Sequence, residues 1–188
     1  MWGVDEIKSY LKDNLKPSRY GHTLGVGKTA IELAGIYNED KQKAEIAALC
    51  HDIAKNMSYE DMLKVIEEEN LKLSNDEKNS KELWHSIIAP IMAKRIFEIE
   101  DEDVLNAMRW HTTGRENMSN LEKIIYLADL IEPSRNFQGI EAIRDISRKN
   151  LNDAVLKALT HTIMYLLTKD CAVDLNSIKA RNYLIYNS

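Results

Sequence analysis

The chain has 188 residues, of which 44% are hydrophobic and 29% charged, and these ordinary globular values exclude a fibrous or disordered chain. The length allows one domain with a substantial apolar core. A net charge of −5 argues against binding along duplex nucleic acid, so we expect no nucleic-acid partner, whereas a small anionic ligand is easier to accommodate.

The pattern of apolar residues predicts an all-α chain. Only 7 glycines and 3 prolines interrupt the sequence, and apolar residues recur at spacings of three and four. In chain order, the predicted helices cover residues 4–14, 18–38, 41–55, 59–70, 76–80, 83–98, 101–111, 119–131, 139–147, 151–168 and 176–184. We interpret residues 1–188 as a single domain.

Several predicted helix ends have a physical reason. Pro17 suits the first turn of a helix, and Ser58 and Ser119 can accept hydrogen bonds as N-caps. Pro133 follows the point where the helix 119–131 should stop. Pro90 falls inside the predicted helix 83–98, so this segment is expected to be either kinked or split into two helices.

Two glycines lie in the middle of the predicted helix 18–38. Gly25 and Gly27 each cost up to ~1 kcal/mol relative to alanine at such positions. We expect the close approach of another helix to compensate for this cost.

The sequence argues against export and membrane insertion. No segment approaches the ~18 consecutive apolar residues of a membrane-spanning helix, and the N-terminus lacks the basic and then apolar pattern of a signal peptide. Cys50 and Cys171 lie far apart in the sequence, and we expect both to be reduced thiols. These features predict a cytoplasmic protein with no membrane partner.

Histidine and aspartate side chains interrupt apolar helical segments. His51 and Asp52 are adjacent within the predicted helix 41–55, where both cost desolvation free energy unless something such as a metal ion binds them. A single histidine on an apolar face is more often a core residue than a ligand. However, His22 lies upstream, and Asp129 lies in an apolar run where an unpaired aspartate would be rare. The combination predicts a metal site.

The donor set indicates which metals fit. Imidazole and carboxylate together suit iron, manganese, cobalt or zinc better than calcium. Neighbouring residues on a helix point about 100° apart, so His51 and Asp52 can share an ion only if it lies over a groove between helices. His22 and Asp129 would close this site and leave open positions for water and substrate.

The order of these residues resembles the HD-domain superfamily of metal-dependent phosphohydrolases, which implies an all-α HD-domain helical bundle. More narrowly, five local sequences resemble the bacterial YqeK-type family, which hydrolyses diadenosine tetraphosphate symmetrically to two ADP. These segments are RYGHTLGV at 19–26, HDIAK at 51–55, HTTG at 111–114, ADLIEPSR at 128–135 and ARNYL at 180–184. The resemblance runs from about residue 7 to about residue 185.

The resemblance also implies a second metal ion. His85 and His111 lie between the doublet and Asp129, and superfamily members with extra histidines there can hold two ions, with the aspartate of the doublet bridging them. Our hypothesis places His22, His51, Asp52 and Asp129 on the first ion, and Asp52, His85 and His111 on the second. Iron is the first choice of metal. The rival hypothesis is a single ion, with His85 and His111 contacting phosphate oxygens.

Basic residues are candidates for binding the polyphosphate. Lys55 lies one helical turn beyond His51, and Arg19 lies three residues before His22, so each shares a face with a ligand candidate. Arg135 serves the nucleotide by resemblance. For each cation the alternative is an exposed ion pair. Asp52 and Lys55 are our catalytic candidates.

Two further groups are candidates for binding the nucleotide. Thr112, Thr113 and Gly114 form a short segment after His111 that could hold phosphate oxygens or a ribose, although a plain turn explains it equally well. By resemblance, the adenine end lies partly against the C-terminal segment, where Asp170 and Arg181 are candidates.

Three functions compete. The first is a metal-dependent hydrolase that cleaves diadenosine tetraphosphate and related dinucleoside polyphosphates to nucleoside diphosphates such as ADP. The second is another HD-type phosphohydrolase that acts on a mononucleotide, a cyclic dinucleotide or a guanosine polyphosphate. The third is a non-catalytic nucleotide-sensing domain, which the presence of all six ligand candidates argues against. The partner in each case is a small-molecule nucleotide, and the resemblance is compatible with a homodimer.

Overall fold

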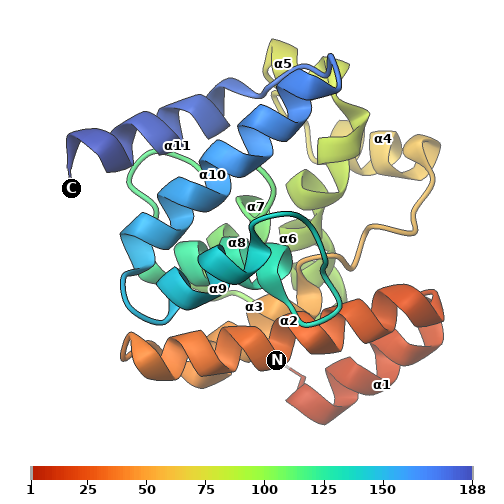
Figure 1. Cartoon of the computed structure of the whole chain (residues 1–188). Coiled ribbons are helices and arrows are strands. Elements are labelled where there is room, and N and C mark those ends of the chain that lie inside the picture. Colours follow the sequence, from red (N-terminus) through yellow and green to blue (C-terminus); the bar gives the residue numbers. More distant parts are fainter. Residues whose placement is uncertain (1, 188) are drawn as a thin grey trace.

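The computed structural model describes residues 2–187, in which eleven α-helices and one 3₁₀ helix occur and no strand occurs (Figure 1). In chain order these are α1 (Val4–Asn14), α2 (Pro17–Ile36), α3 (Lys41–Cys50), α4 (Tyr59–Glu68), α5 (Asn75–Asn79), η1 (Lys81–Leu83), α6 (Trp84–Phe97), α7 (Glu102–Arg109), α8 (Asn120–Ile131), α9 (Ile140–Ser147), α10 (Leu151–Thr168) and α11 (Leu175–Tyr186). The all-α prediction is confirmed.

Helix α8 lies at the centre of the molecule. It packs against α2, α3, α7, α9 and α10. Its residues Ile124, Ile125, Leu127 and Ala128 are fully buried. Full burial of an isoleucine or leucine side chain stabilises a fold by about 1.5–3 kcal/mol. The next residue, Asp129, is therefore held at the edge of a rigid apolar core.

Most helix ends follow the sequence signals. Helix α2 begins at Pro17, and the Ser58 and Ser119 hydroxyls cap α4 and α8 by accepting backbone N–H groups at 3.1 and 3.2 Å. Helix α8 ends two residues before Pro133. Helix α6 continues through Pro90 as one helix rather than splitting into two.

The predicted helix 41–55 is too long, because α3 ends at Cys50. Beyond it, the N–H groups of Ile53 and Lys55 bond the carbonyls three residues earlier, at 3.1 and 2.9 Å, which is the tighter pattern of a 3₁₀ turn. The ring of His51 bonds the Ala48 carbonyl at 2.6 Å, and a further helical turn would use that carbonyl to accept the N–H of Asp52. The doublet therefore lies in a turn after the helix.

The predicted helix 101–111 is also too long. Helix α7 ends at Arg109, so His111 lies in the turn that follows it. The ring of His111 bonds the Met108 carbonyl at 2.7 Å, as His51 bonds Ala48. In both segments a histidine ring forms a hydrogen bond with a backbone carbonyl near the end of a helix.

The two glycines in the middle of α2 have different neighbours. A methyl group at Gly27 would lie 3.9 Å from Leu49 of α3, which is an ordinary contact between two packed helices. Gly25 instead faces the side chain of Glu132, in the segment after α8.

Among the described helices, none combines the length and apolar character that crossing a membrane requires.

An aromatic cluster closes the core where α6 meets the N-terminus. The ring of Phe97 lies 5.2 Å from both Trp2 and Tyr10, in edge-to-face geometry. Phe97 is fully buried, whereas the Trp2 and Tyr10 rings are partly exposed. Edge-to-face pairs of this kind contribute ~0.5–1.5 kcal/mol beyond the burial of their area.

The substitution Phe97→Ala should lower the free energy of unfolding by about 3–5 kcal/mol, because it leaves a cavity among packed rings. Urea unfolding followed by circular dichroism measures this loss. The control is Tyr165→Ala, whose side chain is 55% exposed and whose change should stay within about 0.5 kcal/mol. Equal effects of the two substitutions would contradict the assignment of Phe97 to the core.

Candidate metal centre

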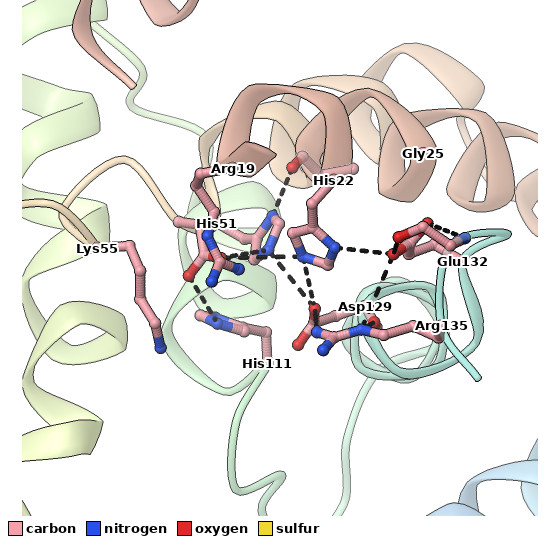
Figure 2. Close-up of polar contacts among 12 residues, drawn as sticks. Arg19, His22, Gly25, His51, Lys55, His111, Asp129, Glu132 and Arg135 are labelled. Atoms are coloured by element: carbon pink, nitrogen blue, oxygen red, sulfur yellow. Dashed lines mark hydrogen bonds and ion pairs between the residues drawn. The ribbon is translucent and has the colours of Figure 1, made fainter. Parts of the chain in front are cut away.

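The six ligand candidates converge at one place in the fold, and Figure 2 shows four of them, His22, His51, His111 and Asp129. They come from α2, the turn after α3, the start of α6, the turn after α7, and α8. We call these residues the ligand cluster: His22, His51, Asp52, His85, His111 and Asp129. All of them except Asp129 are buried.

The ligand cluster contains two groups whose ligand atoms lie within 4.8 Å of one another. One group is His22, His51 and Asp129, and the other is His51, Asp52 and His111. In the first group, the Nε2 atoms of His22 and His51 lie 2.9 and 3.9 Å from one oxygen of Asp129. Both groups mix nitrogen and oxygen donors, and they overlap, because His51 belongs to each of them.

Asp52 lies between two pairs of histidines. Its Oδ2 is 3.3 Å from Nε2 of His51 and 3.9 Å from Nε2 of His22. Its Oδ1 is 3.4 Å from Nε2 of His85 and 3.8 Å from Nε2 of His111. Two oxygens that face different pairs of imidazoles have the geometry that a carboxylate shared by two ions needs.

Backbone carbonyls fix the orientation of three histidine rings. In each case Nδ1 lies within 2.7 Å of the carbonyl three residues earlier: His51 with Ala48, His85 with Glu82, and His111 with Met108. A carbonyl only accepts hydrogen bonds, so Nδ1 carries the proton. The Nε2 atoms of these rings therefore face the ligand cluster and are the atoms that remain to bind a metal.

Two buried atoms of the ligand cluster, Nε2 of His51 and Oδ1 of Asp52, have no hydrogen-bond partner. Nε2 of His22 has only the carboxylate of Asp129 beside it, at 2.9 Å. A buried polar atom without a partner costs about 1–3 kcal/mol. A divalent cation would compensate for this cost, because imidazole nitrogens and carboxylate oxygens are its usual ligands, so the residues fit a metal.

Burial and charge adjust the protonation of the ligand cluster. Burial opposes ionisation of Asp52, but the neighbouring His51 holds the pKa of this carboxyl well below its usual value. Burial likewise opposes ionisation of Asp129, and the hydrogen bond with His22 and the charge of His51 lower its pKa. Burial lowers the pKa of His85 to about 3 and that of His111 to about 4. Near neutral pH these two imidazoles are therefore uncharged, which is the form that binds metals.

The three predicted cations all contact the ligand cluster. Nη1 of Arg19 lies 2.7 Å from Oδ2 of Asp52, and Nη2 of Arg135 lies 2.9 Å from Oδ1 of Asp129. Nζ of Lys55 lies 3.1 Å from Nε2 of His85, and burial lowers the pKa of this lysine. In Figure 2, Lys55 lies at one side of the residues drawn, and the guanidinium of Arg135 lies beside Asp129.

The segment after His111 is held by two side-chain hydrogen bonds. The Thr112 hydroxyl pairs with that of Ser86 at 3.0 Å, and the Thr113 hydroxyl donates to the Gly114 carbonyl at 2.9 Å. Gly114 has φ of +65°, in the left-handed region that favours glycine. These bonds fix the turn that presents His111.

The two C-terminal candidates lie elsewhere. Asp170 is exposed at the end of α10, and Arg181 of α11 donates from Nε to the Thr160 hydroxyl at 2.9 Å. Within residues 2–187, no hydrogen bond or ion pair joins either residue to the ligand cluster. Their role in binding nucleotide stays a prediction.

Sequence reasoning did not single out Glu132. Its carboxylate is buried, with 1% of the residue exposed, and its Oε1 lies 3.0 Å from Nδ1 of His22 (Figure 2). Burial opposes ionisation, but hydrogen bonds from Ser134 and His22 lower the pKa of Glu132. The available signal was its place three residues after Asp129, directly before Pro133.

Comparisons with known proteins identify the family. The model of the HD domain family matches residues 19–134, a segment that contains the whole ligand cluster. Two relatives are named symmetrical bis(5′-nucleosyl)-tetraphosphatase. The one from Bacillus subtilis is 39% identical over 184 residues, covering 98% of each chain. The one from Halalkalibacterium halodurans is 44% identical over 177 residues, covering 93% of each.

A solved structure has the same fold. It is an HD superfamily hydrolase from Clostridium acetobutylicum, described as involved in NAD metabolism, with a TM-score of 0.96 and 46% identity over the full length of both chains. The resemblance found in the sequence is thereby confirmed. The chain belongs to the HD-domain family, within the group whose curated members are named symmetrical bis(5′-nucleosyl)-tetraphosphatases.

Proposed function

We propose that this protein is a metal-dependent hydrolase that cleaves diadenosine tetraphosphate, and related dinucleoside polyphosphates, symmetrically to nucleoside diphosphates. The observation that carries this proposal is the ligand cluster, with its buried and unpaired donor atoms. It occurs in a chain that matches the named tetraphosphatases over at least 93% of its length. A cytoplasmic location and a homodimer stay predictions.

We also propose which residues would hold each of two metal ions. His22, His51 and Asp129, together with Oδ2 of Asp52, would hold one divalent ion. His85 and His111, together with Oδ1 of Asp52, would hold a second. The opposite directions of the two Asp52 oxygens support this division. The imidazole and carboxylate donors suit iron, manganese, cobalt and zinc, and iron is our first choice among them.

Divalent ions, when bound, supply water activation and neutralise phosphate charge. The chain's own contribution is to bind and orient the polyphosphate. Arg19, Lys55 and Arg135 place three cations against the ligand cluster, where they can contact phosphate oxygens. Electrostatic stabilisation of this kind dominates phosphoryl transfer. These local cations also offset the repulsion that a net charge of −5 exerts on an anionic substrate.

Two cavities adjoin the ligand cluster. One, of about 360 Å³, is lined by Arg19, His22, Glu132 and Arg135 among others. A substrate with two nucleoside ends and a bond cleaved at its centre needs binding space on both sides of that bond. The second cavity meets this need from the other side, because its lining includes Lys55 and His85.

The second cavity, of about 440 Å³, has a different character. Tyr59 and Met62 give it apolar surface, and Lys81 places its ammonium 5.6 Å from the centre of the Tyr59 ring. An exposed aromatic ring beside a cation is suited to a purine that carries phosphates. We assign one nucleoside end of the substrate to this cavity.

The substrates of the rival hypothesis are a mononucleotide, a cyclic dinucleotide or a guanosine polyphosphate, which differ from diadenosine tetraphosphate in size or in the bond that is cleaved. A mononucleotide needs only one of the two cavities, and a terminal or bond-specific esterase would release phosphate or pyrophosphate. The presence of cavities on both sides therefore favours the dinucleotide. A sensing domain without catalysis would bind the nucleotide and leave it unchanged.

The first test is a product analysis. Anaerobic protein supplied with iron(II) or manganese(II) should convert diadenosine tetraphosphate to ADP alone, as seen by nucleotide chromatography, and a chelator should abolish this conversion. Asp52→Asn should lower the rate by at least about 100-fold, because it removes the shared negative ligand. Release of orthophosphate or pyrophosphate, or full activity of a folded Asp52→Asn protein, would argue against the proposal.

The second test counts the ions. Titration with manganese(II), followed by calorimetry, should give two ions per chain in the wild type and one in His111→Ala, because this substitution removes a ligand of the second ion only. His161→Ala is the control, because His161 stacks on Phe137 at 4.3 Å outside the ligand cluster. A single ion in the wild type would favour the rival hypothesis, in which His85 and His111 contact phosphate.

The third test concerns the apolar cavity. Tyr59→Ala should raise KM for diadenosine tetraphosphate by about 5-fold to 150-fold and leave kcat nearly unchanged, because stacking of a base on an aromatic ring contributes ~1–3 kcal/mol. Tyr59→Phe keeps the ring and should behave as the wild type. Manganese binding should not change in either variant. An unchanged KM in Tyr59→Ala would place the nucleoside elsewhere.

A further inference from the structure

Glu132 is a buried carboxylate that the proposed reaction does not use directly. Both of its oxygens are engaged. Oε2 accepts the Ser134 N–H at 2.7 Å, and Oε1 accepts the Ser134 hydroxyl and lies 3.0 Å from Nδ1 of His22. Because the side chain is anchored on two sides, its position is fixed by the turn that follows α8.

His22 differs from the other histidines of the ligand cluster in how its ring is held. His51, His85 and His111 bond a carbonyl three residues earlier, at or near the end of a helix. His22 lies inside α2, where the backbone carbonyls are already used by the helix. A ring in the middle of a helix needs a partner from another segment, and Glu132 provides it.

The position of Glu132 depends on the absence of a side chain at Gly25. A Cβ atom built at Gly25 would lie 2.6 Å from Oε2 of Glu132 and 3.4 Å from its Cδ. The first distance is far below a van der Waals contact, so the carboxylate would have to move. Such a movement would strain the bonds that Glu132 makes with Ser134 and His22.

We propose that Glu132 is a positioning residue that fixes the ring of His22 for metal binding, and that residue 25 is glycine because only glycine leaves room for this carboxylate. This inference rests on the metal site of the proposed function, and it does not depend on the identity of the substrate. Figure 2 shows His22 between the carboxylates of Asp129 and Glu132, with Gly25 on the neighbouring turn of α2.

A carboxylate behind a ligating histidine acts in two ways. It holds the proton on Nδ1, which leaves Nε2 free to bind the ion, and its negative charge makes Nε2 a stronger donor. Loss of such a partner typically lowers metal affinity by about 10–100-fold. Arg135, one residue beyond Ser134, bonds Asp129, so the same turn orients two ligands of the first ion.

The experiment compares two glycines of the same helix. Gly25→Ala should weaken manganese(II) binding, measured by calorimetry on the full chain, by about 10–100-fold. Gly21→Ala is the matched control, because a Cβ there meets nothing within 4 Å. Both changes raise helix propensity equally, so a difference between them reports the contact with Glu132. We expect Gly21→Ala to keep the wild-type affinity for manganese(II).

A double-mutant cycle tests the route of the effect. Glu132→Ala should weaken binding as Gly25→Ala does, and adding Gly25→Ala to Glu132→Ala should cause no further loss, because the two act through one contact. Glu132→Gln, which keeps the shape and an acceptor oxygen, should restore part of the affinity. If Glu132→Ala does not fold, the comparison of Gly25→Ala with Gly21→Ala decides the question.

The outcomes separate this inference from the proposed function. Wild-type affinity in Gly25→Ala, or additive losses in the cycle, would overturn the role of Glu132 and leave the metal site intact. A wild-type protein that binds no manganese(II) or iron(II) would overturn both the metal site and this inference.

Discussion

The structure depends on the interaction of two aspartates with the imidazoles around them. A carboxylate inside an apolar helical core costs several kcal/mol unless cations and hydrogen bonds compensate for it. Asp52 is buried, and its nearest neighbours are histidine nitrogens and the guanidinium of Arg19. The rigid packing of α2, α3 and α8 holds these groups together, so stability of the core and preorganisation of the site have one physical origin.

The ends of helices position most of the ligand candidates. Near the C-terminal end of a helix the last carbonyls have no backbone partner within the helix, so they are open to a histidine ring. His51 and His111 use this opportunity after α3 and α7. His22 cannot, and a carboxylate from a distant turn replaces the carbonyl. The same requirement, a fixed proton on Nδ1, is therefore met in two ways.

The sequence predicts the helices well and singles out six polar residues that the fold brings together, because apolar periodicity and misplaced polar residues are local signals. It does not predict that the helix 41–55 stops at Cys50, because that end depends on a bond between His51 and Ala48. The partnership of His22 with Glu132 joins residues 110 positions apart, so no local pattern contains it. The two cavities are likewise products of tertiary packing.

The arrangement of charge supports the proposed polyphosphate substrate in a protein of net negative charge. Arg19 and Arg135 each pair with an aspartate of the ligand cluster, and Lys55 contacts His85. A chain of several phosphates can contact more of these cations than a single phosphate can. In the proposed reaction, these contacts would decide which phosphate of the chain lies beside Asp52. Selection of the central bond would then require no recognition of the bond itself.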